Sequence, residues 1–186
     1  MHRSIMNTPN KVSVFALLLA MALVNTGCDS GGQSEANKAA SPAAPVVDNS
    51  KANIKFTENT VQASTGSDVV LTVAMQDLPA TEGGGITLNY DASMISVLEI
   101  RVNQGNWSFS NKNGVIDNAA GKVSDILFSN YNAVQGNTEI AMITIHTIKP
   151  GKSEITLSGS QVNPFASNGE QLNVSFGRLE VNTNAN

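Results

Sequence analysis

The side chains that most often carry catalysis or bind metals are scarce in this chain. Its 186 residues include one cysteine, Cys28, and two histidines, His2 and His146. We expect the segment that holds His2 to be removed, which leaves His146 as the one histidine of the mature protein. A general base needs a nucleophile and an orienting partner within reach, and no acid neighbours His146 in the sequence. We expect His146 to face solvent from a strand, with contact to a partner as the alternative.

Catalytic and metal-binding motifs are also missing from the sequence. It holds no Gly-x-Ser-x-Gly elbow, phosphate-binding loop or His-Glu-x-x-His pair. Asp91, Asp117, Asp125 and Glu139 are scattered over different expected strands and turns, so they form no paired-carboxylate motif. Residues 111–118 are rich in oxygen atoms but lack the arrangement of a calcium loop, which favours a plain turn. The sequence therefore predicts a protein that is not an enzyme and holds no metal or cofactor.

The charge and composition narrow the class of protein further. Fifteen acids and eleven bases give a net charge of −4, and no cluster of Lys and Arg is present that would grip a phosphate backbone. Nucleic acid is thereby excluded as the expected partner. The length allows one domain with tails. Only 5% of the residues are aromatic and 14% are charged, and many are Asn, Ser, Thr or Gly, which favours a β-rich exported protein.

Residues 1–27 have the features of a signal peptide. The basic residues Arg3 and Lys11 precede an apolar run at 12–24, after which the chain becomes small and polar. At about 1.5 Å per residue this run would span roughly 20 Å as a helix, less than the ~30 Å of a hydrocarbon core. A cleaved signal peptide is therefore favoured over an uncleaved membrane anchor.

Cys28 directly follows the small residues Thr26 and Gly27. In this position it resembles the lipidated cysteine of bacterial lipoproteins. The resemblance implies that Cys28 carries a lipid and anchors the protein to a membrane of the cell envelope, facing the periplasm or the exterior. Residues 28–50 have too few large apolar side chains to fold. We expect them to form a flexible linker with a reach on the order of 25 Å.

From residue 51 to residue 184, apolar and polar side chains alternate in short segments. The alternation is clear at 69–75, 86–90, 98–102 and 141–145, and turn residues separate the segments every eight to twelve positions. The turn signals include the glycine run 83–85 and the pairs Thr65-Gly66, Asn113-Gly114, Ala120-Gly121, Gln135-Gly136, Pro150-Gly151 and Asn168-Gly169. The pattern predicts an all-β domain: an antiparallel β-sandwich with jelly-roll-like topology and about nine strands.

The order of these strand signals resembles the cohesin family, β-sandwich modules best known for binding dockerin modules in cellulose-degrading assemblies. Residues 66–105 look like the cohesin opening, with a Gly-rich approach to a strand that ends in Tyr90-Asp91. Residues 139–148 (EIAMITIHTI) look like a late strand of the family, and residues 151–181 like its closing strands. The resemblance spans about 130 of the 186 residues. It implies a non-catalytic binding module over residues 51–184.

The resemblance also implies a sheet face that engages a protein partner. In cohesins this face includes the strand before Tyr-Asp and the late Ala-x-Ile strand. The outward positions of these strands hold Thr87 and Asn89 in the first and Met142, Thr144 and His146 in the second. A mixed face of this kind suits a protein interface, where a flexible thioether packs and short polar groups set the register. The expected partner is a dockerin-like module or another envelope protein; a merely hydrated sheet face is the alternative.

Carbohydrate binding is the alternative function, because the fold is also similar to that of cellulose-binding modules. Polysaccharide recognition by a flat module uses exposed aromatic rings in one plane. Trp107 and Phe109 share a face at spacing i, i+2, and Tyr131 follows a predicted strand. Exposure of Trp107 and Tyr131 in one plane would favour a sugar ligand, whereas their burial beside an open Met142 and His146 face would favour a protein. Trp107 and Phe109 as core residues, and a purely structural envelope module, are the remaining interpretations.

Overall fold

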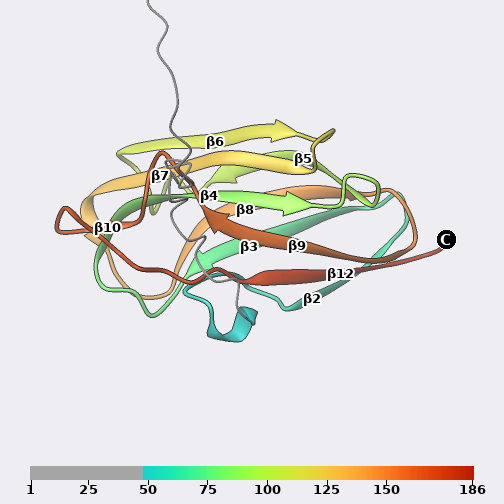
Figure 1. The fold of residues 1–186 in the computed structure, drawn as a ribbon, viewed down its shortest axis with the longest axis horizontal. Helices are drawn as coiled ribbons and strands as arrows, with labels where there is room; N and C mark the ends of the chain where they lie inside the picture. The colour runs from blue at the N-terminus through green and yellow to red at the C-terminus, as the bar shows by residue number, and fades with distance from the viewer. Residues whose placement is uncertain (1–47) are drawn as a thin grey trace, which may run out of the picture. The chain divides into compact units, whose positions relative to one another are not determined.

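Two β-sheets face each other across a shared hydrophobic core in the computed structural model, which describes residues 48–186 (Figure 1). The predicted signal peptide, Cys28 and the linker up to residue 47 lie outside the described residues. The elements are η1 (Asn49–Lys51), β1 (Ile54–Phe56), β2 (Thr60–Ser64), β3 (Asp68–Met75), β4 (Thr81–Tyr90), β5 (Ile95–Val102), β6 (Ser110–Asp117), β7 (Lys122–Val134), β8 (Thr138–Thr147), β9 (Gly151–Gly159), β10 (Ala166–Ser167), β11 (Glu170–Gln171) and β12 (Arg178–Asn184).

The strands are divided between a smaller and a larger sheet. Sheet A has the order β1-β3-β8-β5, and sheet B has the order β11-β10-β4-β9-β12-β2, with β7 also paired to β4 and β6 paired to β7. The chain crosses repeatedly from one sheet to the other, as in a jelly roll. Nine strands have at least five residues, so the predicted all-β sandwich with about nine strands is confirmed. One pair, β12 with β2, is parallel rather than antiparallel.

The alternation of apolar residues produces the core as expected. Leu71, Val73 and Met75 of β3 are buried, as are Ile143 and Ile145 of β8. Because successive side chains of a strand point to opposite faces, strands such as β3 and β8 contribute every second residue to the core. Four aromatic rings pack in a row through this core, with centroid distances of 4.7, 5.6 and 6.0 Å; in order they are Trp107, Phe128, Phe165 and Phe176.

Two of the predicted turn signals lie inside strands. Residues 83–85 belong to β4, and Asn113-Gly114 lies in β6. A side chain at Gly84 would meet the ring of Phe165 at 2.8 Å, so glycine is required there by the close approach of another segment rather than by a turn. Gly114 has a φ of 87°, which only glycine adopts readily, and β6 remains paired with β7 on both sides of it. The predicted turn over 111–118 is therefore wrong up to Asp117.

The packed chain begins slightly before the predicted boundary at Lys51. Asn49 is buried, and its side-chain amide donates to the carbonyl oxygen of Phe56 at 2.8 Å and to Oδ1 of Asn59 at 2.9 Å. Its own Oδ1 accepts from the Phe56 amide at 3.1 Å. A buried polar group needs such partners, and these bonds attach η1 to the sandwich.

Candidate functional site

The structure separates the residues that were expected to form one partner-binding face. Thr87 and Asn89 lie on β4 in sheet B, whereas Met142, Thr144 and His146 lie on β8 in sheet A. The outward faces of the two sheets of a sandwich point in opposite directions, so these five side chains do not share a surface. Thr87 is also buried, with 8% of its surface exposed. The prediction of a single face is therefore wrong, because sequence alternation shows which residues point outward but not from which sheet.

The three residues of β8 occupy the centre of the outer face of sheet A. Met142 lies opposite Thr72 of β3 and Arg101 of β5. Thr144 lies opposite Val70 and Glu99 in the same way. The term "sheet A face" is used below for these outward residues together with the next row: Asp68, Val70, Thr72, Ser96, Glu99, Arg101, Met142, Thr144 and His146.

The sheet A face has an apolar centre and a charged margin. Val70 is 61% exposed and Met142 is 40% exposed, and they lie on neighbouring strands, β3 and β8. On one side of them Arg101 Nε donates to Glu99 Oε1 at 2.7 Å, and this hydrogen bond raises the pKa of Arg101. The apolar side chains of Val70 and Met142 are exposed to solvent, whereas Arg101 and Glu99 at the margin are paired with each other.

Asp68 and His146 form a second close polar pair on this face. His146 Nδ1 lies 2.7 Å from Asp68 Oδ1, and the two residues are 78 positions apart in the sequence. No local pattern indicates this pair, because it depends on the register of β3 against β8. Both side chains are exposed, and an exposed ion pair contributes little to stability.

Ser96 of β5 lies opposite His146 on its other side. Asp68, His146 and Ser96 thus follow one another across three strands, in the order of a Ser-His-Asp triad. In the described part of the chain no hydrogen bond joins Ser96 to His146, while Asp68 is the partner of the ring. A nucleophile is activated by a base within hydrogen-bond reach, and the described residues show no such bond between Ser96 and His146.

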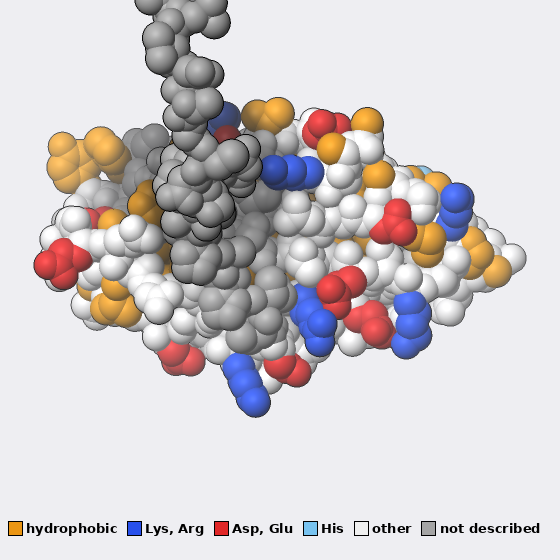
Figure 2. All heavy atoms as spheres, viewed as in Figure 1, with side chains coloured by type: hydrophobic (Ala, Val, Ile, Leu, Met, Phe, Trp, Pro, Cys, Tyr) orange, Lys and Arg blue, Asp and Glu red, His pale blue; other side chains and the backbone are white. Residues whose placement is uncertain are grey.

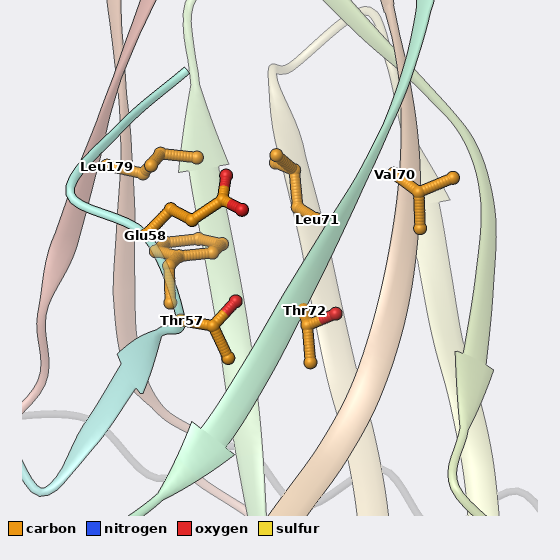
Figure 3. A pocket seen from close by; sticks show the side chains of 7 residues that line it. Thr57, Glu58, Val70, Leu71, Thr72 and Leu179 are labelled. Atoms are coloured by element: carbon orange, nitrogen blue, oxygen red, sulfur yellow. The ribbon is translucent and has the colours of Figure 1, made fainter.

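Two hollows of the described surface are small or polar. One, with a volume of about 40 Å³, lies beside β3 just after β1 and is lined by Thr57, Glu58, Val70 and Thr72 among others (Figure 3). Such a volume holds only a few water molecules. The other, of about 240 Å³, is polar and lined by residues that include Glu154, paired with Arg178 at 3.2 Å. Ligand pockets are usually larger and mostly apolar.

Neither a metal centre nor a membrane-spanning helix is found among residues 48–186. In this range no three His, Cys, Asp or Glu side chains are grouped so that they could hold a metal ion. The same residues include no helix long and apolar enough to cross a bilayer.

The aromatic residues considered for carbohydrate binding do not form one plane. Trp107 is fully buried; its Nε1 donates to the carbonyl oxygen of Glu139 at 3.0 Å, and its ring packs against Phe128. Trp107 therefore offers no ring to a sugar, and that assignment is wrong. Tyr131 is 82% exposed and contacts Phe109 instead, with ring centroids 4.6 Å apart.

Trp107 and Phe109 also fail to share a face. The amides of Asn106 and Trp107 both donate to the carbonyl oxygen of Asn103, so the chain turns here. Strand β6 begins only at Ser110. Side chains at i and i+2 share a face only in an extended strand, which explains why Trp107 enters the core and Phe109 does not.

The comparisons with known proteins agree with this architecture. No protein-family model and no curated protein matches the sequence. Among solved structures, the sixth cohesin of scaffoldin B from Acetivibrio cellulolyticus, in complex with a dockerin, matches with a TM-score of 0.58 and 18% identity over 72% of this chain and 99% of that one. A non-cellulosomal cohesin from Archaeoglobus fulgidus matches with a TM-score of 0.56 and 14% identity, over 70% of this chain and 91% of that one.

A third similar structure is the OlpA cohesin of Clostridium thermocellum, also in complex with a dockerin. Its TM-score is 0.55 and its identity 18%, over 69% of this chain and 99% of that one. In each case the matched region amounts to nearly a whole cohesin module. At these identities the likeness concerns the shape of the chain and not its ligand. The β-sandwich of this protein has the cohesin fold.

Proposed function

We propose that this protein is a non-catalytic binding module that presents the sheet A face to a protein partner. The observation that carries the proposal is the exposure of Val70 and Met142 near each other on a sheet, with charged pairs around them. An apolar centre inside a polar rim is the usual anatomy of a protein interface. The small hollows of the described surface favour recognition by an open face rather than by a pocket.

The side chains of this face suit the parts they would play. Met142 has a flexible, polarizable thioether that adapts to an opposing surface. Val70, Thr72 and Thr144 are β-branched, so they lose little rotamer freedom when a partner covers them. A few desolvated side chains supply most of the affinity of an interface, and Met142 with Val70 is the best candidate for that cluster. The charged pairs at the margin would steer the partner and set its orientation.

The partner that we propose is another protein of the cell envelope whose surface has an apolar patch among charges. A dockerin-like module is included, because two of the similar cohesins were solved in complex with dockerins. By the same resemblance the partner would connect the protein to the breakdown of polysaccharides. The resemblance to cohesins also implies that the strand ending in Tyr90 takes part in partner binding. Asn89, on this strand in sheet B, is therefore tested separately.

Two matched substitutions distinguish the faces. Met142→Asp places a charge at the centre of the sheet A face, and Asn89→Asp places the same charge on the outer side of sheet B. Pull-downs from envelope extract, followed by titration with the recovered partner and with purified dockerin modules, compare both variants with the wild type. We expect Met142→Asp to weaken binding at least tenfold and Asn89→Asp to leave it unchanged. Equal binding by Met142→Asp, or loss with Asn89→Asp alone, would contradict the assignment.

We also infer that the module is exported and held at a membrane by a lipid on Cys28. The support comes from the sequence alone: an apolar run of signal-peptide length, small residues, then the single cysteine of the chain. Cys28→Ser is expected to move the protein from the membrane fraction to the soluble envelope fraction. Membrane association that persists in this variant would contradict the lipid anchor and leave the proposal for the sheet A face unaffected.

A further inference from the structure

Two aromatic side chains of the described domain lie outside its core, in contact with each other. Six of its eight aromatic residues are buried, whereas Phe109 is 61% exposed and Tyr131 is 82% exposed. Their rings pack edge to face, with centroids 4.6 Å apart and an angle of 84° between the planes. Hydrophobic side chains project from the molecular surface in Figure 2 at the end where β10 lies in Figure 1. Since Phe109 and Tyr131 add little to the core, the fold itself does not explain them.

Asn130 fixes the two segments that carry the pair. Its Nδ2 donates to the carbonyl oxygen of Asn106 at 3.0 Å, and its Oδ1 accepts from Ser108 Oγ at 2.9 Å and from the Tyr131 amide at 3.0 Å. The Phe109 amide in turn donates to the carbonyl oxygen of Ser129 at 3.2 Å. These hydrogen bonds fix the backbone that carries the two rings. Ligand binding would therefore cost little conformational entropy in this backbone.

The two segments that carry the pair are polar, and the one carboxylate hydrogen-bonded to them is that of Glu139, which accepts from Asn103 Nδ2 at 3.0 Å. Residues 103–111 and 129–137 contain no Asp, Glu, Lys, Arg or His, and four of the nine residues in each segment are Asn or Gln. Amide side chains both donate and accept hydrogen bonds, as the hydroxyl groups of a sugar do. The sheet A face differs in this respect, because ion pairs line it. A neutral, hydroxyl-rich ligand fits the aromatic pair better than a charged protein or an acidic glycan.

We propose that Phe109 and Tyr131 form a binding site for a neutral, soluble polysaccharide chain. The face of an aromatic ring is electron-rich and attracts the polarised C–H groups on the face of a sugar ring. Tyr131, the more exposed of the two, stacks on one sugar, and Phe109 supports it from the side. Because the rings are perpendicular, they do not form the flat platform that a crystalline polysaccharide surface requires. This site lies apart from the sheet A face and does not depend on the proposed protein partner.

Affinity electrophoresis of the purified full chain tests the site. The gels contain hydroxyethylcellulose, mixed-linkage β-glucan, xyloglucan, glucomannan or arabinoxylan as neutral chains, and polygalacturonate as a charged one; crystalline cellulose is tested by sedimentation. We expect at least one neutral chain to retard the wild type, and neither polygalacturonate nor crystalline cellulose to bind. Tyr131→Ala should raise the dissociation constant at least tenfold, whereas Tyr131→Phe, which keeps the ring, should stay within threefold of the wild type. Leu98→Ala, at an exposed apolar residue outside both proposed sites, is the control and should bind like the wild type.

Urea unfolding of each variant shows that a lost interaction does not come from a lost fold. Three results would overturn the proposal: no retardation of the wild type by any neutral chain, undiminished binding by Tyr131→Ala, or equal binding to the charged or crystalline polymer. Loss of the protein partner of the pull-down in Tyr131→Ala would assign the pair to a protein interface instead. The three polysaccharide results do not bear on the binding of the protein partner by Met142→Asp, so the two proposals fail separately.

Discussion

The outer faces of the two sheets follow the same alternation but serve different ends. On sheet A the outward side chains are partly or fully exposed, and they include the large apolar residues Val70, at 61% exposed, and Met142, at 40% exposed. On sheet B, Thr87 points outward by alternation and is nevertheless buried. An outward position in the strand pattern therefore does not mean an exposed side chain, because another segment of the chain can cover it.

The segment that follows β9 packs against the glycines of β4. Its Ser160 amide donates to the carbonyl oxygen of Gly85 at 2.9 Å, and Asn163 Nδ2 donates to that of Gly84 at 2.9 Å. Phe165 then enters the core against Gly84. The glycines of β4 make room for this segment. This part of sheet B is thus packed against another segment, whereas the centre of the sheet A face is open to solvent.

A substitution at Gly85 tests whether sheet B is packed more tightly than the open face of sheet A. The Cβ would lie 2.7 Å from Ser160 Cβ and 2.8 Å from Leu127 Cδ2, so Gly85→Val forces the covering segment away. We expect the free energy of unfolding to fall by about 1–3 kcal/mol, measured by urea unfolding. The matched control is Thr144→Val on the open face, where we expect a change within about 0.5 kcal/mol. Equal effects of the two variants would show that sheet B is no more tightly packed than sheet A.

Two substitutions near the centre of the sheet A face test which side chains contribute to partner binding. Val70→Ser and Met142→Ser are each expected to weaken partner binding about tenfold, or about 1.4 kcal/mol. The side chains lie in one patch, so the double variant should lose less than the sum of the two. Titration of the partner against all four proteins measures this coupling. Additive losses would place the two residues in separate contacts.

The side chain of Asn118 links the two sheets by hydrogen bonds. Its Oδ1 accepts from Tyr90 Oη of sheet B at 2.6 Å and from the Val97 amide of sheet A at 2.8 Å. We expect Tyr90→Phe to lower the free energy of unfolding by about 1 kcal/mol at neutral pH, because one hydrogen bond is lost. Chemical unfolding at pH 7 measures this loss, with partner binding as the check that the open face is unchanged.

The same tyrosine gives the stability a dependence on alkaline pH. Burial, with the charge of Asp117, raises the pKa of Tyr90 above its ordinary value of 10.0. The folded state then holds the phenol proton more tightly than the unfolded state. The stability contributed by the neutral phenol is complete below pH 10 and is lost as the pH rises through the raised pKa. Tyr90→Phe should remove this part of the alkaline loss, and an identical pH profile in the variant would contradict the assignment.

The smallest effect is expected at the margin of the open face. Asp68→Asn removes the charge that lies 2.7 Å from His146, but both side chains are exposed, so the free energy of unfolding should change by less than about 1 kcal/mol. Partner association should become slower and less dependent on salt, because rim charges act mainly on the rate of encounter. Stopped-flow mixing at two ionic strengths measures the association rate and its dependence on salt. A large loss of stability would mean that this pair supports the fold.

Much of the domain could be predicted from local patterns. The burial of Ala141, Ile143 and Ile145, and the outward positions of Met142 and Thr144, follow from strand geometry alone. The predictions that were wrong, and the contacts that the sequence did not indicate, have one cause. Whether Thr87 joins Met142 on a surface, or Asp68 meets His146, depends on which strands pair, and pairing links residues far apart in the chain.

Two features of the protein lay in the sequence itself: a β-sandwich and a core built from alternating residues. Each follows from the backbone, which turns successive side chains to opposite faces, and from composition. Tertiary packing alone decided which outward side chains remain free. It buried Trp107 and exposed Phe109, covered β4 and left β8 open, because long-range contacts compete for each surface only once the strands have assembled.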